Sequence, residues 1–286
     1  MTRGAILLAI LVVAAFPLNA GADIVVHAPP SLSASARRIE SIDLPALAAA
    51  LAHAGLALPD RVEITLIPDQ DPRAARVPDW IAGLAAAGSI VIFPERVLSY
   101  PYDSLESVVR HEITHLALDA RAGDAPLPRW FHEGVAVSVD SGWGARGQFR
   151  LLLAMFGRPD IAELTRLFTS PSRSETTQAY LLSAVLVHDV RRRHGPGVPG
   201  AIARRVAEGV PFDRAFEIET GEGPDAAAAA SWATYRRWTA WVPAVTSASA
   251  AWTLILLLAF LAFAVQRRRR ARRRRRWDEE EGGATF

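Results

Sequence analysis

Alternating polar and apolar residues predict two short strands in the first third of the chain. Residues 61–67 alternate in this way and are rich in β-branched side chains, which is typical of a half-buried strand. Residues 89–93 form a short apolar run that Pro94 ends, and this run predicts a second strand. The connection between the two runs is rich in Pro, Ala and Gly and has room for a short helix. Together the strands would form a small sheet.

A helical pattern follows the second strand. Asp103 is a suitable N-cap, with Glu106 three residues later, for a helix that runs to about Ala120. A loop with Gly and Pro residues comes next, and a second helix is expected to begin near Arg129 and to end before Gly142. Further helices are expected at residues 44–54, 148–156, 161–168, 176–193, 198–208 and 225–241. A small N-terminal sheet followed by a mainly helical region predicts an α+β fold.

Two uncharged apolar stretches, one near each end of the chain, predict targeting segments. Residues 1–22 combine Arg3, an apolar run at 5–16 and small residues at 20–22, which indicates a secretory signal peptide. Residues 246–265 carry no charge and would extend about 30 Å as a helix, which is the thickness of the hydrocarbon core of a bilayer. They predict one C-terminal transmembrane helix.

Charge next to the second apolar stretch predicts its orientation. Nine arginines lie between residues 267 and 276, and positive charges flank membrane spans on the cytoplasmic side. Residues 266–286 would therefore be a cytoplasmic tail, and the preceding domain would be periplasmic or extracellular. The sequence predicts a single-pass cell-membrane protein with a lead-in at 23–58 that holds one helix, and a catalytic domain at 59–241.

Composition narrows the possible functions of the central domain. Without the Arg-rich tail and the first residues, the region 23–241 has 22 Arg against 26 Asp and Glu, and this balance argues against a nucleic-acid-binding surface. The chain has no cysteine. Disulfides, iron–sulfur clusters, a Cys nucleophile and thiolate zinc sites are therefore excluded.

The first expected helix after the strands carries a pattern typical of hydrolytic metal sites. His111 and His115 are four residues apart, so their imidazoles lie on one helix face and can bind one metal ion. Glu112 lies beside the first histidine, where its carboxylate can accept the proton of a water molecule that the metal activates. This spacing favours a metal-dependent peptidase. The competing interpretation is a pair of surface or core histidines with no ligand role.

A catalytic zinc ion usually has three protein ligands, so a further ligand is required. We expect Glu133, on the helix after the loop, because antiparallel packing of two helices across a short connection would bring it opposite the histidines. Gly134 and Ala136 would permit a close approach of the helix backbones. His132 is the competing candidate, but it adjoins Glu133 and should point in another direction.

Two segments resemble a known family. The segment HEITHLALDARAG, which begins at His111, resembles the active-site helix of thermolysin-like peptidases, and WFHEGVA, which contains Glu133, resembles the glutamate-bearing helix of gluzincins, particularly the small bacterial peptidase MA-like domains. The resemblance covers about residues 60–241 and is specific only in these two segments. It implies a zincin-like domain with His111, His115 and Glu133 as ligands of one zinc ion per chain, Glu112 as general base, and a protein or peptide substrate.

The resemblance also suggests a role for Tyr180. In related aminopeptidases a tyrosine hydroxyl donates a hydrogen bond to the oxyanion, and the alternative is that Tyr180 packs in the core. His188 and His194 are other candidates, although their charged neighbours favour helix-end surface positions. Asp119 is either a partner of a metal ligand or, as its place near a helix end favours, a solvated charge. No exopeptidase motif is recognisable, which leaves endopeptidase and exopeptidase action open.

Two other functions are compatible with parts of this pattern. An inactive peptidase fold could serve as a membrane-tethered binding or assembly module, but the complete set of two His and two Glu argues against it. An intramembrane protease also uses this motif. The helix expected to carry it contains Glu106 and Arg110 and is far from either apolar stretch, so an aqueous site is expected.

Overall fold

The computed structural model describes residues 23–86, 88–97, 104–140 and 159–239, with a few residues between 256 and 267. The chain divides into two compact units, residues 1–228 and 229–286, and helix α10 (Pro224–Thr239) contains the boundary. The expected signal peptide at 1–22, the expected helix at 148–156 and nearly all of the Arg-rich tail lie outside the described residues.

The described strands form one four-stranded sheet. Its order is β1-β2-β4-β3, with parallel pairing between the first three and an antiparallel edge strand β3. Strand β2 alternates as its sequence predicts, since Val62, Ile64 and Leu66 are buried while Arg61 and Glu63 are exposed. The predictions of strands near 61–67 and 89–93 are confirmed. The strands are β1 (Asp23–His27), β2 (Arg61–Leu66), β3 (Gly83–Ala86) and β4 (Ser89–Ile92).

The segment 23–58, which the sequence predicts to be a lead-in, contributes a strand to this sheet. Strand β1 pairs with β2 from Asp23 opposite Arg61 to His27 opposite Thr65. Two helices follow it, α1 (Ser33–Glu40) and α2 (Leu44–His53). The α2 side chains of Leu47 and Leu51 are fully buried. Residues 23–58 therefore contribute a strand and two helices to the first unit.

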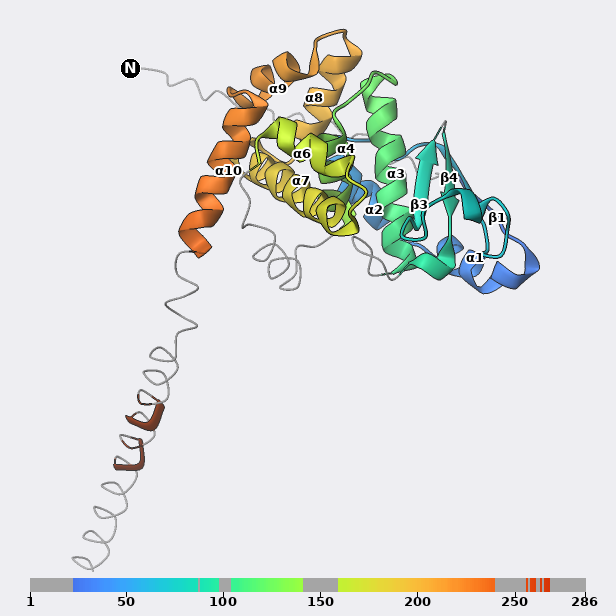
Figure 1. Ribbon diagram of the computed structural model, residues 1–286, viewed down its shortest axis with the longest axis horizontal. Coiled ribbons are helices and arrows are strands. Elements are labelled where there is room, and N and C mark those ends of the chain that lie inside the picture. The colour runs from blue at the N-terminus through green and yellow to red at the C-terminus, as the bar shows by residue number, and fades with distance from the viewer. Residues whose placement is uncertain are drawn as a thin grey trace, which may run out of the picture. The chain divides into compact units, whose positions relative to one another are not determined.

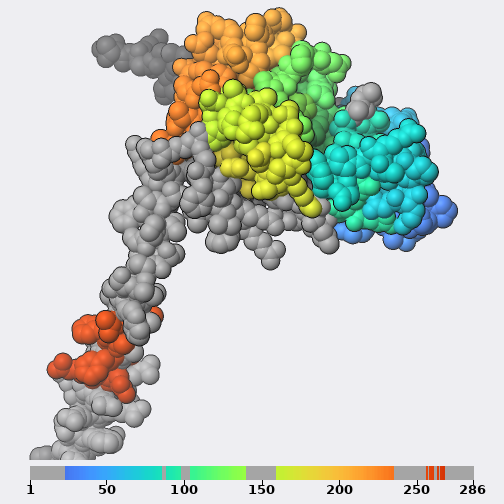
Figure 2. Space-filling view, viewed as in Figure 1, coloured from blue at the N-terminus to red at the C-terminus, as the bar shows by residue number. Residues whose placement is uncertain are grey.

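Helix α3 (Leu105–Ala122) lies between the sheet and the helices α4, α6, α7 and α8, while α1 lies on the sheet side (Figure 1). It packs against β3 and β4 on one side and against α4 and α8 on the other. Figure 2 shows the strand region in cyan and the helices in green and yellow as adjoining parts of one surface. The remaining helices of the first unit are α4 (Arg129–Asp140), α6 (Ile161–Phe168), α7 (Arg173–His194), α8 (Val198–Ala207) and α9 (Phe212–Thr220).

The start of α3 differs by one residue from the expected cap. Ser104 is the N-cap: its hydroxyl accepts a hydrogen bond from the Ser107 amide at 3.1 Å, and the Ser107 hydroxyl accepts one from the Ser104 amide at 3.2 Å. Glu106 instead binds Arg38 of α1 at 2.9 Å. Asp103 lies outside the described residues. Both caps predict nearly the same helix, so the orientation of the His111 face is unaffected.

The fold-class prediction is wrong in its last part. The structure is mainly helical with a small mixed sheet, and no helix among the described residues is long and apolar enough to cross a membrane. Most of the stretch 246–265 lies outside the described residues. A span requires about 20 consecutive helical residues, so an apolar stretch of suitable length is not by itself a transmembrane helix.

Candidate metal site

Helix α3 presents two histidines to the same side, as their spacing predicts. The Nε2 atoms of His111 and His115 lie 3.0 Å apart, and the two rings meet edge to face with centroids 4.6 Å apart. His111 and the adjacent Glu112 are buried. Two histidine nitrogens this close, both turned to one point, form two corners of a metal site.

Helix α4 supplies the third corner. The Oε2 atom of Glu133 lies 3.3 Å from Nε2 of His111 and 3.4 Å from Nε2 of His115. Ligands about 2.0–2.1 Å from a tetrahedral ion lie about 3.3 Å from each other, so three donors at these separations match one face of a tetrahedron. The buried group of His111, His115 and Glu133 could hold a metal ion.

The electrostatics of Glu133 favour the charged carboxylate. Burial of this side chain opposes ionisation, but its hydrogen bonds with His111 and His115 outweigh that effect and hold the pKa of Glu133 well below its usual range. The carboxylate therefore stays deprotonated, which is the form that binds a metal ion.

Aromatic packing and a glycine fix the position of Glu133. Trp130 and Phe131, in the first turn of α4, are buried against Phe212 and Phe216 of α9, with ring centroids 5.1 to 6.1 Å apart. On another side of the helix, a Cβ added at Gly134 would lie 2.5 Å from the backbone oxygen of Ser183 in α7. The close approach expected at Gly134 therefore occurs against α7.

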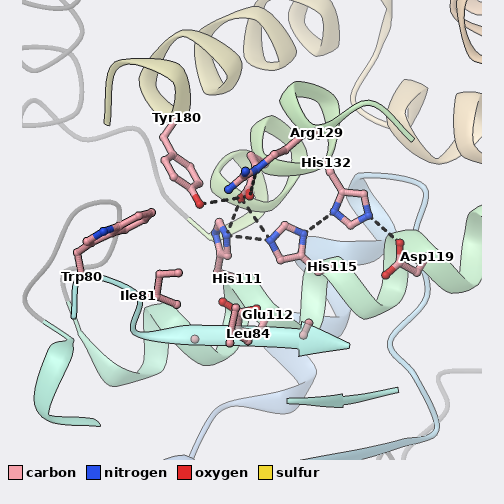
Figure 3. Close-up of a pocket in the computed structure, with 13 residues that line it drawn as sticks. Trp80, Ile81, Leu84, His111, Glu112, His115, Asp119, Arg129, His132 and Tyr180 are labelled. Carbon is pink, nitrogen blue, oxygen red and sulfur yellow. Dashed lines mark hydrogen bonds and ion pairs between the residues drawn. The ribbon is translucent and has the colours of Figure 1, made fainter. Parts of the chain in front are cut away.

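The second oxygen of Glu133 contacts two further side chains (Figure 3). The Tyr180 hydroxyl donates a hydrogen bond to Oε1 at 3.2 Å, and Nε of Arg129 lies 3.6 Å from the same oxygen. Burial, together with the charge of Glu133, raises the pKa of Tyr180 well above its usual value, so this hydroxyl remains a donor. Tyr180 and Arg129 thus occupy Oε1 and leave Oε2 facing the histidines.

His132 does not belong to the triangle formed by His111, His115 and Glu133, which we call the metal-binding triangle. Its Nδ1 lies 2.6 Å from Nδ1 of His115, on the side of that ring opposite Nε2, and its Nε2 lies 2.7 Å from Oδ1 of Asp119 (Figure 3). The competition between His132 and Glu133 for the third ligand position is thereby resolved geometrically in favour of Glu133. Asp119 therefore contacts His132 behind the site, whereas the sequence favoured the interpretation that Asp119 is a solvated charge.

The metal-binding triangle lines a cavity of about 240 Å³. Its walls come from α3, α4, α7 and the edge strand β3 with the turn before it, and Glu112 is among the lining residues. Trp80, Ile81 and Leu84 add an apolar wall that the sequence did not reveal. His188 and His194 are not among the residues that line this cavity.

Strand β3 approaches Glu112 closely because Gly83 has no side chain. A Cβ added at Gly83 would lie 2.6 Å from Oε1 of Glu112 and 2.8 Å from a methyl carbon of Val108. The Glu112 carboxylate is the end of a flexible side chain and would be displaced, whereas Val108 is stiff and buried, so β3 would also shift slightly away from α3.

If Glu112 acts as the general base of the expected peptide hydrolysis, Gly83→Ala should lower kcat by about 10- to 100-fold, because small displacements of a reacting group are costly. Metal content should stay at that of the natural chain, since Gly83 approaches Glu112 and not the three ligands. Gly223→Ala is the matched control, because a Cβ there meets no atom within 4 Å. An unchanged kcat for Gly83→Ala would contradict this role.

Comparison with known proteins adds no assignment. A scan against protein-family models finds no match for this chain, and a search of curated proteins finds none either.

Proposed function

We propose that this chain is a zinc-dependent metallopeptidase of the gluzincin type that hydrolyses protein or peptide substrates. The observation that carries the proposal is the buried triangle of His111, His115 and Glu133 with Glu112 beside it on one wall of an accessible cavity. Two imidazoles and one carboxylate suit zinc, and one ion per chain is expected. The resemblance of the two helical segments to gluzincins supports the same assignment.

The reaction would divide between the ion and the protein. A zinc ion bound there would polarise the substrate carbonyl and lower the pKa of a water molecule. Glu112 would accept the proton of the attacking water and deliver it to the leaving amine, so its carboxylate must reach both. Its buried position on the cavity wall supports this role.

Other residues would bind and orient the substrate. In the described sheet β3 is an edge strand, and its Gly83, Leu84 and Ala85 line the cavity. An extended peptide could add to this edge through backbone hydrogen bonds. The Tyr180 hydroxyl donates to Oε1 of Glu133 in this structure, so it would donate to the developing oxyanion only after turning its hydrogen away from Glu133.

A cleavage assay on the full chain tests this function. The protein loaded with Zn²⁺ is incubated with a mixed peptide library, and new termini are identified by mass spectrometry. We expect cleavage that 1,10-phenanthroline abolishes and added Zn²⁺ restores, while the non-chelating isomer 1,7-phenanthroline has no effect. Cleavage that persists after metal removal would contradict the proposal. Stoichiometric zinc without any cleavage would favour a binding module.

A further inference from the structure

A row of three polar side chains extends from the metal-binding triangle toward the surface. His115 contributes its Nε2 to the triangle, its Nδ1 meets His132 at 2.6 Å, and His132 meets Asp119 at 2.7 Å. Asp119 lies one helical turn after His115 on α3, and His132 comes from α4, so the row also joins the two helices of the site (Figure 3).

The positions of the hydrogens follow from these contacts. A neutral imidazole carries one N–H and one acceptor nitrogen. If His115 donates from Nδ1 to His132, then His132 carries its hydrogen on Nε2 and donates it to the Asp119 carboxylate. If His132 donates instead, its Nε2 is a bare acceptor that faces the carboxylate at 2.7 Å. Two acceptors with no hydrogen between them repel, so between the two neutral arrangements the Asp119 carboxylate favours the first.

The selected arrangement prepares His115 for a metal ion. With its hydrogen on Nδ1, the lone pair of His115 lies on Nε2, which faces His111 and Glu133 at 3.0 and 3.4 Å. Without an ion, a hydrogen on Nε2 would be donated to Glu133, so Glu133 and Asp119 favour opposite tautomers of His115. A bound ion would take the place of that hydrogen and leave only the Asp119 preference. The opposite arrangement would place a hydrogen on Nε2, where it would exclude a ligand bond. Metal-binding histidines commonly donate a hydrogen bond from the N–H of their other ring nitrogen directly to a carboxylate or carbonyl. Here a second histidine stands between the ligand and the carboxylate.

We propose that His132 and Asp119 are positioning residues that hold His115 in the metal-binding tautomer and thereby increase the affinity of the site for zinc. The inference rests on the metal site of the proposed function, although it does not require peptide hydrolysis. His132 is not an alternative ligand, because its Nδ1 meets Nδ1 of His115, on the opposite side of that ring from the ligand atom Nε2, and its other nitrogen contacts Asp119. The side chain of Asp119 is 48% exposed, so directional hydrogen bonding matters more here than its charge.

Zinc affinity of the full chain is the direct test. The metal-free protein competes with a chelating indicator for Zn²⁺, and Co²⁺ absorption reports the ligand geometry. We expect His132→Leu to weaken Zn²⁺ binding by about 10- to 100-fold. His132→Asn should lose less, because an amide oxygen can accept from Nδ1 of His115. Asp119→Ala, which removes the acceptor for Nε2 of His132, should weaken binding by about 10-fold, and Asp119→Asn should lose less because its amide oxygen can still accept.

Control variants distinguish a loss of Zn²⁺ affinity caused by mispositioning of His115 from one caused by a change in net charge or by misfolding. Asp124→Asn removes the same charge from an exposed position after α3, and its affinity should equal that of the natural chain. In the His132→Leu chain, Asp119→Ala should have no further effect, since Asp119 acts through His132. Thermal unfolding of the metal-free variants checks that each is folded.

The possible outcomes distinguish the two proposals. We call the positioning of His115 by His132 and Asp119 the relay. A natural chain that binds Zn²⁺ while His132→Leu and Asp119→Ala bind equally tightly would overturn the relay alone. Additive losses in the double variant would also overturn it. Failure of the natural chain to bind Zn²⁺ would overturn both the relay and the proposed function. Tight binding without peptide cleavage would leave the relay supported and the peptidase proposal rejected.

Discussion

Glu112→Gln is expected to lower kcat for peptide hydrolysis by about 10²- to 10⁴-fold, the usual contribution of a general acid–base group. Glutamine has nearly the same size and shape, so it fits the buried position on α3 beside His111. It cannot accept a proton from water at neutral pH. The three metal-binding side chains are unchanged, and zinc content should therefore remain at about one ion per chain.

The measurement combines single-turnover peptide cleavage with metal analysis of the same preparation. Glu106→Gln is a matched control, because it makes the same change on α3 at a residue that pairs with Arg38 away from the cavity. A Glu112→Gln protein that cleaves peptides at the natural rate would rule out Glu112 as the proton acceptor. Loss of metal from this variant would assign Glu112 a structural role in the site.

His115→Ala is expected to weaken Zn²⁺ binding by more than about 100-fold, because removing only an outer partner of a ligand already costs about 10- to 100-fold. The change removes one corner of the triangle and one of the two histidines that keep Glu133 ionised. Hydrolysis should be lost together with the metal. Since His132 would also lose its contact with His115, the benefit from Asp119 should disappear in this background.

Competition titration with a chelating indicator measures this loss. His53→Ala is the matched control, because His53 is exposed at the end of α2 and does not line the cavity. Circular dichroism of the metal-free proteins should show that both variants retain their helices. Natural affinity in His115→Ala would require another residue to take the ligand position.

The spacing of residues along the chain was sufficient to predict the three residues of the metal-binding triangle. A helix turns by a fixed angle at each residue, so His111 and His115 face one side whatever the surrounding fold is. Glu133 could be expected because a short connection constrains α4 to pack beside α3. The strands near residues 61–67 and 89–93 were similarly predictable, since alternation places their apolar side chains on one face.

Other parts of the site could not be read from local patterns. Tyr180 reaches Glu133 from a helix 47 residues further along the chain, and no periodicity predicts which helix packs there. The position of β3 against Glu112 depends on sheet order, which short strands leave undetermined.

The sequence alone therefore determined the ligand types, their helical spacing and the neighbouring carboxylate, because these depend on covalent order and helix geometry. Only the tertiary structure decided which of the adjacent residues His132 and Glu133 faces the histidines. In the folded chain the first turn of α4 is held by aromatic packing against α9, and this packing sets the rotation of the helix. That rotation turns Glu133 into the triangle and His132 behind His115, where it meets Asp119.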